Sequence, residues 1–344
     1  MINNLHEEAL CFDDILLVPQ ESNIPSRHAV DLSMKLGAGD RAITLELPIV
    51  ASPMDTVCGK DMCIAISNLG GIGILHRYLP IEEQVEIVSS LSAGGYKFGV
   101  SVGATNTFME DARKLIDAGA KLILVDIANG HSHYAIEAVK QLRAEFDVHI
   151  MAGNVSTAQG FKNLALAGAD SIRVGIGGGS ACTTRIVSGH GVPTLQSIID
   201  VFNAKHLYPN TSIIADGGIR NSGDMVKAFA AGSDAVMVGS MLAGTDESPG
   251  EVTKDHNGRD VKIFRGMASA HAQMDKFGKV SVAEGISTTV PYKGSVSHII
   301  EQVRGGLGSG CSYSGVNNLS ELAKSAEYIK VSTASLNESK PHAI

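Results

Sequence analysis

Eight short apolar runs rich in β-branched residues recur along the chain, and stretches with a helical period separate them. The runs cover residues 48–51, 72–75, 98–101, 122–125, 148–151, 171–174, 212–215 and 235–238. The helical stretches include 109–118, 134–146 and 158–167, and several end in Ala-Gly-Ala, Leu-Gly-Gly or Ala-Gly-Ser, which is typical of helix ends. Strands that alternate with helices in this way form right-handed βαβ units with parallel strands.

Eight such units in one chain predict a closed (β/α)8 TIM barrel of the α/β class. An open, doubly wound sheet is the alternative, and it is less favoured because no G-x-G-x-x-G motif opens the first helix. In a barrel of this kind the active site lies at the C-terminal ends of the strands. The residues that follow each run are therefore the candidates for function.

Composition is that of an ordinary enzyme, with 344 residues, 44% hydrophobic and 19% charged residues, and a net charge of −8. The acidic balance and the absence of a basic cluster argue against a nucleic-acid partner. No apolar run is long enough to span a membrane and the first residues lack a signal-peptide pattern, so we expect a cytoplasmic protein. Five scattered cysteines without C-x-x-C spacing predict neither disulfides nor a zinc site.

The predicted organisation is one catalytic domain over residues 1–344, without a regulatory insert. Residues 1–47 form an N-terminal extension, expected under or beside the barrel. Residues 241–293 separate the last strand from an amphipathic segment, 297–303. A connection of this length is commonly a functional lid or a linker, and we predict a lid that carries an acid/base. The tail, 333–344, has no periodicity and is predicted to be mobile.

A thiol on a glycine-rich loop is the strongest chemical signal. Residues 175–185 read Gly-Ile-Gly-Gly-Gly-Ser-Ala-Cys-Thr-Thr-Arg and directly follow the sixth run. Glycines at this density let backbone N–H groups and a ligand approach where a Cβ would collide. Cys182 is therefore placed to attack an electrophilic carbon. A buried, inert cysteine in a flexible turn is the alternative interpretation.

Polar or glycine-rich segments follow most of the other runs. They are 52–55, 76–78, 126–130, 153–154, 216–218 and 239–240. The glycine-rich turns after the seventh and eighth runs each precede a helix, which suits a phosphate bound by backbone N–H groups. Each polar residue alone could be a helix cap or a turn residue, but their placement at one end of the barrel favours a shared site.

Several motifs occur in the order found in one enzyme family. Besides the cysteine loop they are FDDILLVP at 12–19, SPMDTV at 52–57, ADGGIR at 215–220 and YKG at 292–294. On these motifs the chain resembles the inosine monophosphate (IMP) dehydrogenase and guanosine monophosphate (GMP) reductase family over nearly its full length. The resemblance implies a barrel, usually a homotetramer, that binds a purine nucleotide. It also implies a thiol that attacks C2 of the base, and hydride exchange with a nicotinamide cofactor.

The resemblance further implies roles for individual residues. Cys182 would be the nucleophile, and Glu284 with Thr184 would relay the proton that the leaving group at C2 needs. The substrate-binding set is Ser52, Met54, Arg77, Ser180, Asp216, Gly217, Gly218, Gly239, Ser240, Gly266, Met267 and Ala268. The cofactor-binding set is Gly103, Ala104, Thr105, Asp126, Asn129, Gly130 and Asn154. A monovalent cation such as K+ is expected on Gly175, Gly177 and Cys182.

The lid distinguishes the two activities of the family. Dehydrogenases activate water with an Arg-Tyr pair on a mobile flap, and no arginine or tyrosine stands between Gly266 and Pro291. We therefore predict a GMP reductase that converts GMP to IMP and ammonia with NADPH through a Cys182 thioimidate. One alternative is an NAD-dependent IMP dehydrogenase without a regulatory domain, which would form xanthosine monophosphate (XMP). The other is a barrel that binds purine nucleotide without catalysis.

Other positions depart from the family pattern. Segments 126–130, 150–154 and 311–313 resemble reductases, whereas 185–187, 244–250 and 338–342 resemble dehydrogenases. Gly178 replaces a usual proline, and Gly308 and Ser281 each replace an expected arginine. Arg77 stands where lysine is common. Because a guanidinium stays charged and donates a fork of hydrogen bonds, we expect Arg77 to orient a ligand and not to shuttle a proton.

Overall fold

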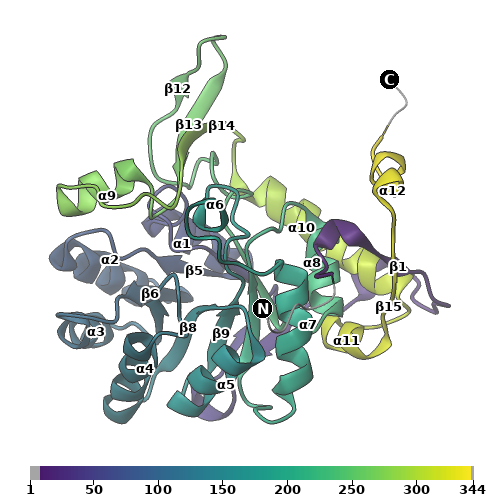
Figure 1. Ribbon diagram of the computed structural model, residues 1–344, viewed down its shortest axis with the longest axis horizontal. Coiled ribbons are helices and arrows are strands. Elements are labelled where there is room, and N and C mark those ends of the chain that lie inside the picture. Colours follow the sequence, from purple (N-terminus) through teal and green to yellow (C-terminus); the bar gives the residue numbers. More distant parts are fainter. Residues whose placement is uncertain (1–7, 342–344) are drawn as a thin grey trace, which may run out of the picture.

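The computed structural model describes residues 8–341, and its centre is a closed barrel of parallel strands (Figure 1). The strands are β4 (Ile49–Ala51), β5 (Ile72–Leu75), β6 (Phe98–Val102), β7 (Leu122–Asp126), β8 (His149–Val155), β9 (Ser171–Val174), β10 (Ser212–Asp216) and β11 (Ala235–Val238). Each strand pairs with the next along the chain, and β11 closes the barrel on β4. Every predicted run overlaps one of these strands, so the predicted (β/α)8 barrel is confirmed.

Helices surround the barrel on the outside. They are α1 (Lys60–Asn68), α2 (Ile81–Ala93), α3 (Phe108–Asp117), α4 (His133–Glu145), α5 (Ala158–Ala167), α7 (Thr194–Lys205), α8 (Ser222–Ala230) and α10 (Val296–Tyr313). Three of them, α3, α4 and α5, begin and end within one residue of the predicted ranges. In α3 the buried residues are Phe108, Ala112 and Leu115, a spacing that places them on one face of a helix. The helices therefore pack on the barrel through narrow apolar faces.

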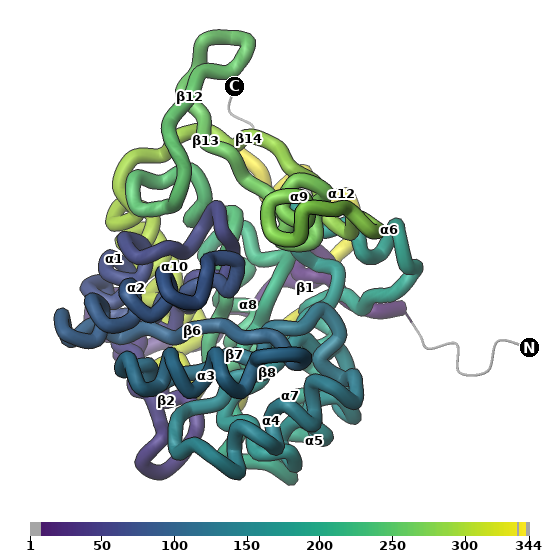
Figure 2. Tube along the Cα trace, turned by 90° about the vertical axis from the view of Figure 1, so that its left-hand side faces the viewer, coloured from purple at the N-terminus to yellow at the C-terminus, as the bar shows by residue number. Residues whose placement is uncertain are grey.

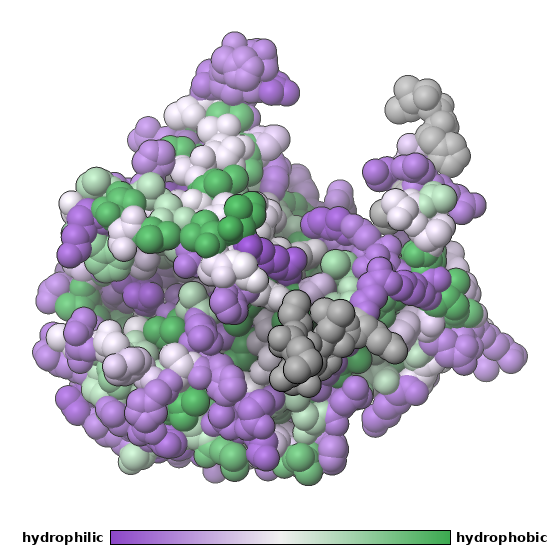
Figure 3. Space-filling model, viewed as in Figure 1, coloured by the Kyte–Doolittle hydropathy of each residue, from purple (hydrophilic) through white to green (hydrophobic). Residues whose placement is uncertain are grey.

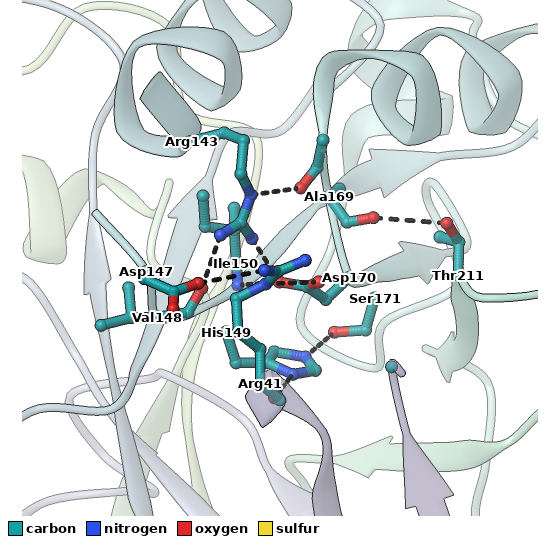
Figure 4. Close-up of polar contacts among 12 residues, drawn as sticks. Arg41, Arg143, Asp147, Val148, His149, Ile150, Ala169, Asp170, Ser171 and Thr211 are labelled. Carbon is teal, nitrogen blue, oxygen red and sulfur yellow. Dashed lines mark hydrogen bonds and ion pairs between the residues drawn. The ribbon is translucent and has the colours of Figure 1, made fainter. Parts of the chain in front are cut away.

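A hairpin in the N-terminal extension covers the bottom of the barrel, where the strands begin. The hairpin, β2 (Met34–Leu36) and β3 (Ile43–Leu45), places Leu36 and Leu45 in the core that fills the barrel interior. A polar cluster lies beside the hairpin (Figure 4). There Asp170 accepts from Arg41 Nε at 3.2 Å and also binds Arg143, while His149 Nε2 lies 2.8 Å from Ser171 Oγ. The buried carboxylate is thus fully paired, as a buried charge requires.

The predicted lid forms a small antiparallel sheet and a helix over the opposite end of the barrel (Figure 2). The sheet consists of β12 (Thr253–Lys254), β13 (Asp260–Arg265) and β14 (Ser287–Pro291), and the helix is α9 (Ala270–Phe277). Apolar side chains gather on the surface around α9 (Figure 3), where the exposed ones are Met274, Phe277, Val280 and Val282. No helix among residues 8–341 is long and apolar enough to cross a membrane.

In the C-terminal part the structure extends one predicted helix beyond its predicted end. The amphipathic segment predicted over 297–303 is the start of α10, which continues to Tyr313. Its glycines permit close packing, because a Cβ on Gly308 would lie 2.4 Å from the carbonyl oxygen of Arg27. The tail predicted to be mobile contains α12 (Thr333–Glu338), and β15 (Glu327–Lys330) before it pairs with β1 (Ile15–Val18). Its mobility stays a prediction. Residues 342–344 of that tail lie outside the described residues.

Candidate active site

A cavity of about 320 Å³ lies at the C-terminal ends of the barrel strands. Every residue predicted as catalytic or substrate-binding contributes to its lining, from Ser52 after β4 to Glu284 in the lid. Asp126 and Asn154 of the predicted cofactor set line it as well. The loops that follow the strands are far apart in sequence, and barrel closure brings them together.

Cys182 lies in this cavity at the start of the short helix α6 (Thr184–Ser188). Its Sγ is 3.1 Å from Thr184 Oγ1, and the backbone N–H of Thr184 donates to Sγ at 3.5 Å. The hydroxyl can turn its proton toward the sulfur once the thiol is deprotonated. Both groups can then donate to the sulfur of the thiolate, which is the nucleophilic form of cysteine.

The lid pairs with the cysteine loop through backbone hydrogen bonds. The N–H of Thr183 donates to the carbonyl of Glu284 at 3.1 Å, and the N–H of Ile286 donates to the carbonyl of Ala181 at 2.9 Å. Gly285 forms an antiparallel bridge with the cysteine between these two bonds. The backbones of the lid and the cysteine loop approach each other closely here, since a Cβ on Gly285 would lie 3.0 Å from the Ala181 oxygen. This pairing is what brings the Glu284 carboxylate into the same cavity as the thiol.

The glycine turn after β10 packs backbone to backbone against the cysteine loop. Gly217 and Gly218 have φ angles of +91° and +78°, which favour glycine. A Cβ on Gly217 would lie 3.2 Å from the backbone of Gly178 and of Gly179. A Cβ on Gly178 would lie 2.7 Å from Thr194 Oγ1. Gly178, where the family usually has proline, therefore leaves room for the Thr194 side chain.

An arginine that sequence reasoning missed lies in the cavity wall between two carboxylates. The side chain of Arg173 is 5% exposed; it forms an ion pair with Asp126, and its Nη1 is 3.6 Å from Asp216 Oδ2. Asn154 Nδ2 donates to the same Asp216 oxygen at 2.8 Å. Burial raises the pKa of Asp216, and the positive charge of Arg173 opposes that rise. The available signal was a charged residue inside the apolar run 171–174.

A second cavity, of about 440 Å³, adjoins the first, and Arg77 lines both. Gly103 and Thr105 of the predicted cofactor set line it, together with Lys276 of α9. Burial lowers the pKa of Lys276, and the nearby charge of Arg77 lowers it further. Gln84 in the wall is 5% exposed, and its Oε1 has no hydrogen-bond partner in the part of the chain described. The cavity thus offers two cations and a free buried acceptor, which suits a ligand with phosphates and N–H or O–H donors.

The other predicted cofactor residues lie elsewhere. Asn129 lines a neighbouring cavity that also contacts Thr184 and Glu284. Ala104 is buried in the core, and the N–H of Gly130 donates to the backbone carbonyl of Asn154 at 2.7 Å. Neither Ala104 nor Gly130 is in the lining of these three cavities.

The residues predicted to hold K+ would supply it mainly with carbonyl oxygens. The carbonyl of Gly175 accepts from Asn154 Nδ2 at 2.8 Å, and Gly177 has a left-handed φ of +79°. Across residues 8–341 no group of three or more His, Cys, Asp or Glu side chains could hold a metal ion. The carbonyl site for K+ stays a prediction.

Two further contacts join the lid to the barrel and were not predicted. Arg265 at the end of β13 donates to Asp55 Oδ2 at 2.6 Å and also pairs with Asp275 of α9. The hydroxyl of Tyr78 donates to the backbone carbonyl of Met267 at 2.8 Å. Asp55 and Arg265 are 210 positions apart in sequence, so no local pattern could have paired them.

A family model described as the IMP dehydrogenase / GMP reductase domain matches residues 9–342. An IMP dehydrogenase of Nitrosopumilus maritimus (strain SCM1) is 33% identical over 98% of this chain and 98% of that protein. A GMP reductase of Leishmania major is 34% identical over 98% of this chain and 97% of that protein.

A solved structure is similar over the whole barrel and lid. It is a cysteine-to-alanine variant of GMP reductase from Trypanosoma brucei in complex with guanosine 5′-monophosphate. The TM-score is 0.93 at 30% sequence identity, and the match covers 99% of each chain. Relatives with either activity are thus similar to this chain at nearly the same identity, so identity alone does not separate a reductase from a dehydrogenase.

Proposed function

Because the chain belongs to the IMP dehydrogenase / GMP reductase family, we propose that it is a GMP reductase. In this reaction GMP, NADPH and two protons give IMP, ammonium and NADP+. The observation that carries the proposal is the composition of the lid. It presents Glu284 beside the thiol, and between Gly266 and Pro291 it contains no arginine or tyrosine that could activate water for hydrolysis of the adduct.

The substrate would bind along the cavity from the glycine turns to the lid. Ser180 with the N–H groups of Gly217 and Gly218 would hold the 5′-phosphate, with Gly239 and Ser240 on the facing loop. The Asp216 carboxylate would accept from the ribose hydroxyls. The base would lie against the backbone of Gly266, Met267 and Ala268, with C2 toward the thiol. Ser52, Met54 and Arg77 would complete the wall.

In the first step the Cys182 thiolate would add to C2 of the guanine. The exocyclic amine would take a proton from Glu284, passed through the Thr184 hydroxyl, and leave as ammonia. The base would then be joined to the enzyme as a thioimidate. The amine must be protonated before it leaves, because ammonia leaves far more readily than amide anion.

NADPH would occupy the second cavity and the part of the first that Asp126 and Asn154 line. Lys276 and Arg77 would bind its phosphates, and Gln84 Oε1 would accept from an amino or hydroxyl group. When bound, the reduced cofactor supplies a hydride to C2. The C2–S bond would then break, so that Cys182 leaves as the thiolate that the short contacts from Thr184 stabilise. A homotetramer and a bound K+ are expected from the family resemblance and stay predictions.

Absorbance at 340 nm tests the direction of the reaction. Purified protein with GMP and NADPH should lose absorbance, and protein with IMP and NAD should gain little, because the lid lacks the Arg-Tyr pair. A parallel cuvette with NADH in place of NADPH reports cofactor preference. Robust formation of XMP from IMP would overturn the reductase assignment in favour of a dehydrogenase. Nucleotide binding without turnover in either cuvette would favour a non-catalytic barrel.

A further inference from the structure

Arg220 comes two residues after the glycine turn 217–218 and is held by carboxylates from two parts of the chain. Its Nη1 and Nη2 donate to the two carboxylate oxygens of Asp13 at 2.9 and 2.5 Å. Its Nε donates to Asp224 Oδ2 at 3.0 Å. The guanidinium therefore makes a two-bond fork to the N-terminal segment and a further bond to α8. Such forks fix orientation as well as distance.

The α8 side of this network is anchored by a buried carboxylate. Asp224 lies in the first turn of the helix and is 2% exposed. Its Oδ2 accepts the backbone N–H of Arg220 at 3.0 Å, and its own N–H donates to Asn221 Oδ1 at 2.9 Å. The carboxylate thus holds the chain at the point where the glycine turn ends.

The Asp13 side is anchored as well. Phe12 is 5% exposed, and its carbonyl accepts from Lys227 Nζ of α8 at 2.8 Å. The backbone N–H of Gln196 in α7 donates to the Leu10 carbonyl at 3.1 Å, and the N–H of Leu10 donates to Gln196 Oε1 at 3.3 Å. The ring of Phe12 comes within 3.8 Å of the Cβ position at Gly218. The N-terminal segment 10–14 therefore lies against α7, α8 and the glycine turn together, near the purple strand β1 in Figure 1.

We propose that Asp13 is a positioning residue for the nucleotide phosphate. By holding Arg220 it keeps the backbone N–H groups of Gly217 and Gly218 aimed into the cavity. Both residues have left-handed φ angles, and as glycines they could adopt many other conformations. The charge of Arg220 is neutralised by the Asp13 and Asp224 carboxylates, so we do not expect Arg220 to bind the ligand directly. The inference rests on the proposed function, because it assumes that this turn binds a phosphate.

Because the Asp13–Arg220 ion pair is exposed, its role in positioning the phosphate can be distinguished from a role in stability. The side chains of Arg220 and Asp13 are 54% and 42% exposed, and ion pairs at such positions contribute little to folding. Removing the Asp13 charge should therefore leave the fold intact. The effect should appear in binding, and only for ligands that carry the phosphate.

The test compares a nucleotide with its nucleoside by calorimetry. Asp13→Asn should raise the Kd for IMP about tenfold, leave the weaker Kd for inosine unchanged, and leave the melting temperature within about 2 °C of wild type. In turnover the variant should raise KM for GMP with little change in kcat. Asp260→Asn, which removes the similarly exposed Lys254–Asp260 pair between β12 and β13, is the matched control and should change none of these values.

Arg220→Lys is the second variant, because lysine keeps the charge but cannot make the fork to Asp13. It should show the same loss for IMP and not for inosine, whether or not Asp13→Asn folds. Equal losses for IMP and inosine, or no loss for either, would overturn the proposal and make the network structural. A wild-type protein that binds neither IMP nor GMP would instead overturn the proposed function, and the inference with it.

Discussion

Among the five cysteines, Cys182 alone combines a cavity position with partial exposure. Cys58, Cys63 and Cys311 are buried and Cys11 is exposed away from the cavity. Burial raises the pKa of Cys311 to about 12 and that of Cys58 well above its usual range. Thiols in such surroundings are rarely thiolates at neutral pH and are poor nucleophiles. Position and exposure therefore favour Cys182 as the one nucleophile among the five cysteines.

Replacing Cys182 tests this directly. Cys182→Ala should lower kcat by several orders of magnitude, since the covalent step has no substitute, yet still bind IMP, because phosphate and ribose contacts lie on other residues. Stopped-flow turnover and calorimetry measure the two effects. Cys311→Ala is the control and should keep its activity. Retained turnover in Cys182→Ala, or labelling of Cys58 or Cys311 by an electrophilic purine, would contradict the assignment.

Glu284 can be tested by separating the two half-reactions. Glu284→Gln keeps the shape of the side chain but cannot carry a proton, so it should slow deamination of GMP by ~10²–10⁴-fold. The partial reaction of IMP with NADP+, seen as a small burst of NADPH and covalent adduct, needs only the thiol and a stacked cofactor and should change much less. Single-turnover absorbance at 340 nm resolves both. Equal effects on both steps, or no effect on either, would make Glu284 a structural residue of the lid.

At the scale of elements, α10 shows how tertiary contacts determine where glycines are accepted. Its glycines lower helix propensity, and for that reason the sequence predicted only the segment before Gly305. In the structure the helix runs through them and packs on α8 and on the turn at Arg27. Gly308 stands where an arginine is expected in the family, and the Arg27 carbonyl occupies the space that any Cβ there would need.

A pair of alanine substitutions in α10 should change stability in opposite directions. At Gly305 nothing lies within 4 Å of an added Cβ, so Gly305→Ala should stabilise the protein by about 0.5–1 kcal/mol through helix propensity. Gly308→Ala meets the Arg27 oxygen at 2.4 Å and should destabilise it by about 1–3 kcal/mol. Urea unfolding midpoints report both. Stabilisation by both variants would mean that α10 is not held against Arg27.

Periodic patterns predicted the strands, α3, α4 and α5, because those signals are local, whereas most residues that line the main cavity were implied by the family resemblance. Contacts between distant segments could not be predicted in the same way. Arg173 was included in a strand run, and only the closed barrel shows that its charge lies between Asp126 and Asp216. The fork from Arg220 to Asp13 likewise joins residues 207 positions apart. Roles of loop residues near the site were the hardest to predict. Ala104, for example, was expected to bind the cofactor but is a core residue.

At the scale of the whole molecule, a buried histidine lies near each end of the barrel. His76 follows β5 below the lid, where Asp55, Lys276 and Arg265 are its charged neighbours, and burial lowers its pKa to about 4. His149 begins β8 beside the Asp170 cluster, with Arg143 and Arg41 near it, and burial lowers its pKa too. Burial therefore favours the neutral form of both side chains in the folded protein. In the unfolded chain both titrate near their usual value of about 6.5.

The sign of the pH effect follows from this difference. A histidine whose folded pKa is depressed binds its proton more readily in the unfolded chain, so its contribution to stability is lost as pH falls below about 6.5. For His76, with a folded pKa of about 4, the loss at pH 5 is roughly 2 kcal/mol. Burial raises the pKa of Asp216 and of Asp234, and these groups act in the opposite direction as pH falls. The histidine contribution must therefore be measured as a difference between variants.

Urea unfolding of wild type, His76→Gln and the control His256→Gln at pH 7.5 and pH 5.0 gives that difference. Wild type and the control, whose histidine is exposed on the β12–β13 connection, should lose stability equally between the two pH values. His76→Gln should lose roughly 2 kcal/mol less, whatever its stability at pH 7.5, because it has no proton to take up at that position. Equal losses in all three proteins would show that His76 is not held neutral, and that the region under the lid is open to water.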